Sequence, residues 1–127
     1  VMNVETSIKM SKIKNDRFKR EILNEVKHTS RSGNKEGYCK FYKNNTKEHE
    51  DAKWDIFCRL KKLGFEVWTE VTFTNGFRAD ILAIDNSTAL CFEILGSETE
   101  EMCKLKEDKY PCKIIMIKAS EAKDFTL

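Results

Sequence analysis

The sequence predicts a mixed α/β fold in which helices pack on one mixed β-sheet. Three kinds of signal carry this prediction: amphipathic runs with a helical period, short apolar or alternating runs typical of strands, and the caps and turns that separate them. Together they predict the element order α-β-β-β-α-β over about residues 46–118. The length of 127 residues suits one domain with a buried core.

The charge is unevenly distributed along the chain. Residues 1–47 contain 12 Lys and Arg against 5 Asp and Glu, whereas the remaining residues contain 11 against 16. We therefore expect a basic N-terminal arm over 1–45 and a core domain over 46–127. A basic arm on an acidic body suits a polyanionic partner such as nucleic acid, although a solvated tail would show the same charge.

Two segments of the arm have recognisable patterns. Asn15 and Asp16 can cap a helix over about 17–28, whose basic side chains lie off its apolar stripe. The segment 36–43 interleaves three aromatic residues with lysines, a pattern that can stack on bases while the lysines meet phosphates. An edge strand that seals the core is the alternative for this segment, and we favour it. The expected nucleic-acid-binding residues are basic: Lys19, Arg20, Lys27, Arg31, Lys40, Lys43 and Arg78.

The first half of the core domain is predicted from a cap, an alternation and a turn. Thr46 can cap an amphipathic helix over 47–63. Residues 65–73 alternate between apolar and polar side chains, as a half-buried strand does. The Asn75-Gly76 pair is the strongest short hairpin signal, and it leads into an apolar strand over 77–84.

The second half of the core domain is predicted from the same kinds of signal. A polar turn at 85–87 connects the previous strand to another apolar strand over 88–95. A capping box opens a helix over 97–110, and a proline ends it. A buried strand over 112–117 and a short helix over 119–125 complete the chain.

Each of the two central strands carries one carboxylate where an apolar residue is expected. These are Asp80 in the first strand and Glu93 in the second. A buried charge costs several kcal/mol unless it is paired or binds a cation. We therefore expect the two carboxylates to lie close together and to share one cation.

These residues also carry a family resemblance. Arg78-Ala79-Asp80, a twelve-residue gap and Glu93-Ile94-Leu95 resemble the motif of the PD-(D/E)XK nuclease superfamily. The start of the 47–63 helix and the Gly-Phe-Glu-Val that follows it resemble the archaeal Holliday-junction resolvase-like members. The resemblance implies a restriction-endonuclease-like core with an additional basic N-terminal helical arm. The chain departs from the motif at one position, where Leu95 stands in place of the family's lysine.

The resemblance implies a metal-dependent nuclease that hydrolyses phosphodiester bonds of DNA, with branched or structured DNA among the candidate substrates. Asp80, Glu93 and the carbonyl of Ile94 would hold Mg²⁺ or Mn²⁺, which prefer oxygen ligands. Glu50, from the first core helix, would position water or a second ion. Glu70 is a weaker candidate for that role, because the alternation of its strand can place it on the exposed face.

A displaced lysine could replace the one that the motif lacks. Lys106 is the first candidate, because it falls near the middle of the apolar face of the 97–110 helix. Its stem could instead lie along the sheet edge while the ammonium reaches solvent. The catalytic set is thus Glu50, Asp80, Glu93 and Lys106. The alternatives are a catalytically inactive nuclease-fold protein that binds nucleic acid and a structural or protein-partner role.

Composition and cysteine spacing limit the cellular location, the metal sites and the partners that we expect for the chain. No apolar run approaches the roughly 18 residues of a membrane helix, and no signal peptide is evident, so we expect a cytoplasmic protein without a membrane partner. Five cysteines, no CxxC pair and no histidine at zinc spacing indicate reduced thiols, and neither a zinc site nor a disulfide scaffold. DNA is the expected partner, ahead of RNA, and a homodimer is one assembly that such a nuclease could adopt.

Overall fold

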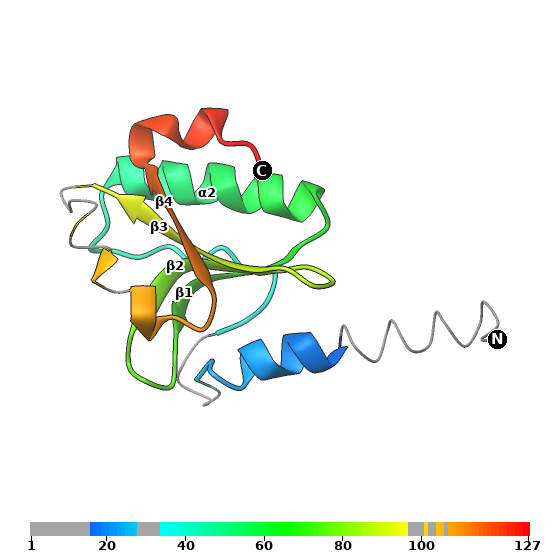
Figure 1. Ribbon diagram of the computed structural model, residues 1–127. Helices are drawn as coiled ribbons and strands as arrows, with labels where there is room; N and C mark the ends of the chain where they lie inside the picture. Colours follow the sequence, from blue (N-terminus) through cyan, green and yellow to red (C-terminus); the bar gives the residue numbers. More distant parts are fainter. Residues whose placement is uncertain (1–15, 28–33, 97–100, 102–103, 106) are drawn as a thin grey trace.

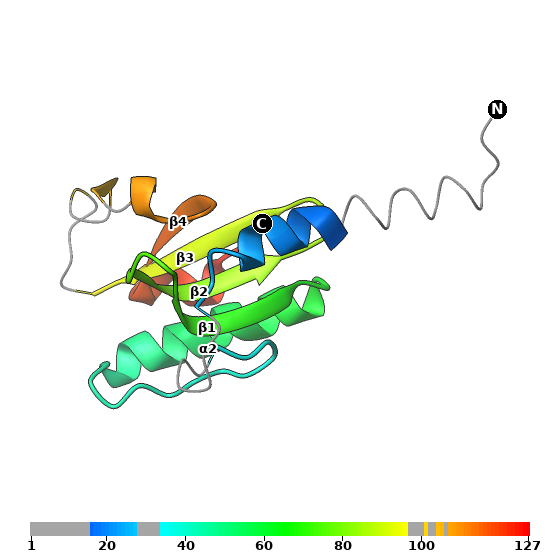
Figure 2. The same cartoon turned by 90° about the horizontal axis from the view of Figure 1, so that it is seen from below.

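The computed structural model describes residues 16–27, 34–96, 101, 104–105 and 107–127. Within them, a four-stranded mixed sheet has helix α2 on one face and a shorter helix near the N-terminus on the other (Figure 1). Figure 2 shows the same three layers from below. The predicted mixed α/β class, with one mixed sheet, is therefore confirmed.

The sheet contains four strands in the order β1-β2-β3-β4. The strands are β1 (Glu66–Thr72), β2 (Arg78–Ile84), β3 (Ala89–Leu95) and β4 (Lys113–Lys118). β1 with β2 and β2 with β3 are antiparallel pairs, whereas β3 and β4 run parallel. Each predicted strand is confirmed to within one residue at both ends. The Asn75-Gly76 turn is also confirmed, since Gly76 adopts φ 88° and its N–H donates to the carbonyl of Phe73 at 3.0 Å.

Helix α2 (Lys47–Lys62) covers one face of the sheet. Thr46 caps it as predicted, since its side chain accepts a hydrogen bond from the N–H of His49 at 3.1 Å. The core on this side joins the buried face of α2 to inward side chains of the sheet. The final helix is a 3₁₀ helix, η2 (Ala119–Asp124), which packs against α2 through the fully buried Ala122.

The opposite face is covered by the N-terminal segment. Residues 16–23 are helical, and their apolar side chains pack against the second core cluster of the sheet. The helix is shorter than the predicted 17–28. It ends because Val26 turns into an antiparallel bridge with Phe73, and the Lys27 N–H donates to the carbonyl of Thr72 at 2.9 Å. Pairing with the sheet thus replaces the last predicted turn of helix.

The segment 36–43 contains no strand, so the edge-strand interpretation is wrong. The segment follows β1 but pairs with it irregularly. Gly37 donates to the Val67 carbonyl at 2.8 Å, and the Lys40 N–H donates to the Thr69 hydroxyl at 2.7 Å. A side chain therefore takes the place of a ladder partner, and the aromatic side chains of the segment are left on the surface.

The connection between β3 and β4 is described only in part. Glu101 and Lys104 are helical, and a 3₁₀ helix, η1 (Glu107–Lys109), follows. The rest of the predicted 97–110 helix, including Lys106, lies outside the described residues, as does Arg31. In the part of the chain that is described, no helix is long and apolar enough to cross a membrane.

Candidate functional site

Four carboxylates from four elements meet at one end of the sheet. Glu50 comes from α2, Glu70 from β1, Asp80 from β2 and Glu93 from β3. Glu50, Glu70 and Glu93 are buried, and the side chain of Asp80 is largely so. A cluster of this kind is costly unless cations or hydrogen bonds offset the charge.

Asp80 and Glu93 lie side by side on neighbouring strands. The register of β2 and β3 pairs Ile81 with Phe92, which brings the preceding Asp80 beside the following Glu93. Asp80 Oδ2 accepts a hydrogen bond from the backbone N–H of Ile94 at 2.8 Å. Glu93 accepts a hydrogen bond from the buried hydroxyl of Tyr110.

Glu70 is buried because β1 departs from regular alternation at this residue. In a regular strand Val67 and Val71 would share one face. Here Val67 packs under α2, whereas Val71 packs on the opposite face. The reversal occurs at Glu70, which has a left-handed φ of 49° and is 4% exposed. The expectation that alternation places Glu70 on the exposed face is therefore wrong. A left-handed non-glycine residue costs about 1–3 kcal/mol.

β2 departs from alternation at the neighbouring position. Ala79 and Ile81 would share a face in a regular strand, yet they belong to opposite core clusters. The irregularity therefore includes Asp80, and the two strands change face together. A short kink of this type re-aims side chains, and here it turns two carboxylates toward α2.

A lysine that the sequence analysis missed lies inside the cluster. Lys53 on α2 is 1% exposed, and its ammonium lies 2.9 Å from the Glu50 carboxylate and 3.2 Å from Glu70 Oε1. The ammonium also donates to the backbone carbonyl of Lys40. The signal was present in the sequence, because Lys53 lies three residues before the buried Ile56 and thus on the apolar face of the helix.

The surroundings of Glu50 keep it ionised. Burial acts to raise its pKa, but hydrogen bonds from Lys53, from the Asn45 side chain and from the Tyr42 backbone N–H lower it below its ordinary value. Asn45 Nδ2 also reaches Glu70 Oε1 at 3.1 Å. The loop before α2 therefore holds both glutamates in place.

His49 was not predicted as a site residue either. It lies between Glu50 on α2 and Asp80 on β2 and contacts both. Its Nε2 lies 3.4 Å from Asp80 Oδ2, and its Nδ1 lies 3.5 Å from Glu50 Oε1. The hydrogen bond to Asp80 raises the pKa of His49, against the effect of burial. Burial acts to raise the pKa of Asp80, but the contacts with His49 and with the Ile94 N–H lower it.

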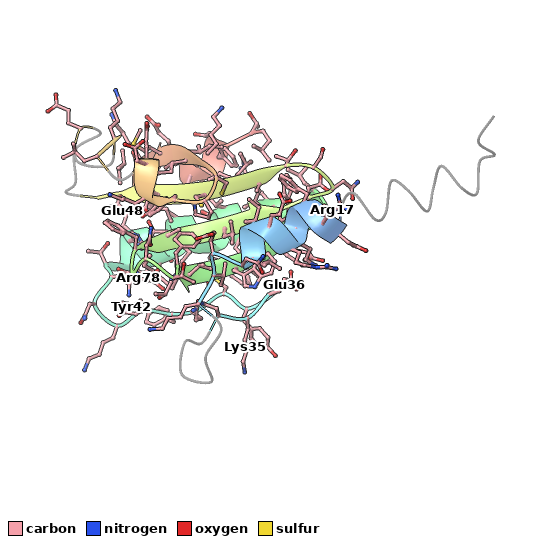
Figure 3. The ribbon with its side chains drawn as sticks, turned by 60° about the horizontal axis from the view of Figure 1, so that its bottom comes forward. Arg17, Lys35, Glu36, Tyr42, Glu48 and Arg78 are labelled. Carbon is pink, nitrogen blue, oxygen red and sulfur yellow. The ribbon has the colours of Figure 1, made fainter. Side chains whose placement is uncertain are left out.

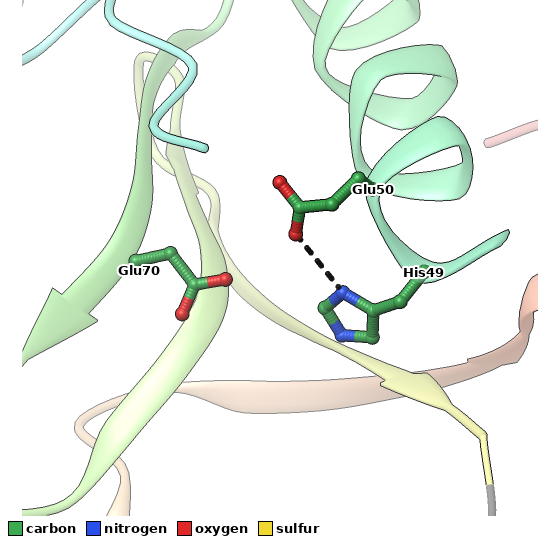
Figure 4. Close-up of side chains that lie close together, drawn as sticks. All are labelled: His49, Glu50 and Glu70. Atoms are coloured by element: carbon green, nitrogen blue, oxygen red, sulfur yellow. Dashed lines mark ion pairs between the residues drawn. The ribbon is translucent and has the colours of Figure 1, made fainter. Parts of the chain in front are cut away.

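His49, Glu50 and Glu70 form a group suited to a metal ion (Figure 4). Each offers one ligand atom within 4.8 Å of the others. Two buried atoms of the group, His49 Nδ1 and Glu70 Oε2, have no hydrogen-bond partner among the residues that the structure describes. Each lies within ion-pair distance of one charged group: His49 Nδ1 is 3.5 Å from Glu50 Oε1, and Glu70 Oε2 is 3.3 Å from Arg78 Nε. Carboxylate oxygens with free lone pairs fit Mg²⁺ or Mn²⁺, and an imidazole favours Mn²⁺ of the two.

The expected nucleic-acid-binding residues divide into two groups. Lys40 and Arg78 join the site: Lys40 Nζ donates to the Glu70 carbonyl at 2.9 Å, and Arg78 contacts Glu70 and the Tyr42 ring. Lys43 is exposed on the adjoining loop. The others that are described belong to the N-terminal segment, where Lys19 pairs with Glu66 and where Arg20 and Lys27 are exposed.

No family model, curated protein or solved structure matches this chain.

Proposed function

We propose that this chain is a divalent-metal-dependent nuclease that hydrolyses phosphodiester bonds of DNA, with a restriction-endonuclease-like core and a variant active site. The convergence of four carboxylates at one end of the sheet, two of them paired with one buried lysine, carries the proposal. Gathering these charges and holding Glu70 in a strained backbone both cost stability. A cation-dependent activity is a reason for a protein to retain an arrangement of that cost.

Asp80, Glu93 and the carbonyl of Ile94 would hold Mg²⁺ or Mn²⁺. The ion would supply Lewis-acid polarisation of the phosphate and a more acidic bound water. Glu50 and Glu70 would orient water or contribute to a second ion. His49, within 3.4 Å of Asp80, can hold a proton between the two pairs of carboxylates.

Lys53 would supply the positive charge that the motif lysine has in the family, since Leu95 cannot carry one. Its ammonium is already within the carboxylate cluster, and a cation fixed near a phosphate stabilises the charge that develops there. Lys106, the lysine first expected in this role, is the second candidate.

The same lysine favours a second function. The ammonium of Lys53 neutralises Glu50 and Glu70 as a metal ion would, and this arrangement suits a catalytically inactive nuclease-fold protein that binds nucleic acid. The two functions differ in one measurable respect, which is whether a divalent ion makes the protein cut DNA.

The test is cleavage of supercoiled plasmid and of a branched DNA junction in Mg²⁺ or Mn²⁺. We expect wild type to nick at least one substrate, and Asp80→Asn and Glu50→Gln to abolish nicking while binding persists. Asp51→Asn is the matched control, because Asp51 is the exposed neighbour of Glu50 on the same helix and pairs only with Lys47 among the described residues. Wild type that binds DNA but cuts neither substrate in either metal would replace the nuclease with the inactive binding protein.

A further inference from the structure

We propose that the loop formed by residues 34–45 is a stacking platform for unpaired nucleobases, so that the substrate is single-stranded or locally unpaired nucleic acid. This inference rests on the proposed function, because it names the substrate class of the same site. Three independent features of the loop carry it: the exposure of its aromatic rings, its attachment to the carboxylates, and the cations that accompany the rings.

The loop presents aromatic side chains to solvent. Phe41 is 81% exposed and Tyr38 is 61% exposed, and Tyr42 is exposed beside them. Large aromatic side chains are normally buried, so three exposed ones within five residues indicate a binding surface. Every base has a π-face, so rings of this kind bind unpaired strands with little dependence on sequence.

The backbone of the loop is tied directly to the carboxylate cluster. The Tyr42 N–H donates to Glu50 Oε2 at 3.2 Å, and the Asn45 side chain donates to Glu50 Oε1 at 2.7 Å. The Lys40 carbonyl accepts a hydrogen bond from Lys53. The backbone that carries the rings is therefore anchored beside the carboxylates.

Cations accompany two of the rings. The Arg78 guanidinium lies 4.4 Å from the centre of the Tyr42 ring, and Figure 3 shows the two side chains together at one edge of the molecule. Lys35 Nζ lies 5.7 Å from the centre of the Tyr38 ring. With the exposed Lys43, these residues combine positive charge with stacking faces, which complements a phosphate backbone with free bases.

A duplex does not offer the same contacts. Its bases are stacked inside the helix, and exposing one requires unstacking and unpairing. Rings that project from a loop beside the site can contact the bases of an unpaired strand without that cost. The platform therefore predicts a preference for unpaired strands over duplexes at equal salt.

The test measures binding separately from cleavage. Fluorescence anisotropy in EDTA would follow the full chain with a labelled single-stranded DNA, a single-stranded RNA of the same sequence and the corresponding DNA duplex. We expect tighter binding to the single strands, and a loss of about 5- to 150-fold for Phe41→Ala, as expected when one stacked base is lost. Phe41→Tyr keeps the ring and should keep the affinity. Leu63→Ala removes an exposed apolar residue at the far end of α2 and should change nothing.

The outcomes separate this inference from the proposed function. Unchanged affinity in Phe41→Ala and Tyr38→Ala, or tighter binding to the duplex, would overturn the platform even if wild type cuts DNA. Phe41-dependent binding by a protein that cuts nothing would support the platform and overturn the nuclease. The affinities for single-stranded DNA and RNA show which kind of strand is recognised. Equal affinity indicates recognition through bases and phosphates, and tighter RNA binding indicates an additional contact to the 2′-hydroxyl.

Discussion

Replacing Lys53 with methionine should show how much its ion pairs with the buried carboxylates stabilise the fold. Lys53→Met keeps the length and packing of the stem but leaves Glu50 and Glu70 buried without their ammonium partner. Removing one partner of a buried ion pair typically costs about 3–5 kcal/mol. For a chain of this length each kcal/mol lowers Tm by roughly 3–5 °C, so we expect a fall of roughly 9–25 °C in EDTA.

A divalent ion should reverse part of that loss. A ligand that binds only the folded state stabilises it by about 2.7 kcal/mol at 100 times its Kd. Mn²⁺ should therefore raise the Tm of Lys53→Met by more than that of wild type, because the ion meets two carboxylates that have lost their shared ammonium partner. Differential scanning fluorimetry with and without EDTA gives both quantities from one preparation.

The matched control is Lys47→Met. Lys47 lies on the same helix and pairs with Asp51 in solvent, so its loss should leave Tm nearly unchanged with or without metal. Two results would refute the reasoning: a loss below about 1 kcal/mol for Lys53→Met in EDTA, where a buried pair predicts several, or a metal-induced rise in Tm that is equal in the variant and wild type.

Two further predictions concern the neighbours of Asp80 and Glu93. His49 has a raised pKa in the folded state, so its contribution to the free energy of unfolding is complete below about pH 6 and is lost as pH rises through that raised value. Urea unfolding in EDTA should therefore show that the free energy of unfolding of wild type exceeds that of His49→Gln by most near about pH 5.5 and by least near about pH 9. A difference that grows with pH would contradict the assigned contact with Asp80. Tyr110→Phe keeps the ring contact with Phe73 but removes the hydroxyl that donates to Glu93, which should cost about 1–3 kcal/mol in the same assay. Phe73→Leu, which disturbs the ring contact and spares the hydroxyl, distinguishes the two contributions.

Local signals predicted the fold well, because they depend on residues near one another in the chain. Thr46 caps α2 through the N–H of His49, three residues later, and Asn75-Gly76 closes its hairpin within four residues. The signals failed where a distant contact overrode them. The helix predicted over 17–28 stops at 23 because Val26 pairs with Phe73, which no local pattern encodes.

The site was predictable only in part for the same reason. Asp80 and Glu93 stood out as charges inside apolar strands, and the turn between the strands brings them together. Lys53 could have been found from its helical position, although nothing local identifies Glu70 as its partner. Glu70 was only the weaker candidate, because its burial depends on a backbone kink shared by β1 and β2 that the sequence does not show.

The left-handed backbone at Glu70 also constrains how this sequence can change over time. At φ 49° glycine or asparagine would fit with less strain than glutamate, so the backbone alone disfavours the residue that stands there. A lineage that no longer needed the carboxylate would be expected to drift toward those residues, whereas one that uses it would keep glutamate despite the strain. Variation at this single position among descendants of the chain would therefore record whether the chemistry of the site has been under selection.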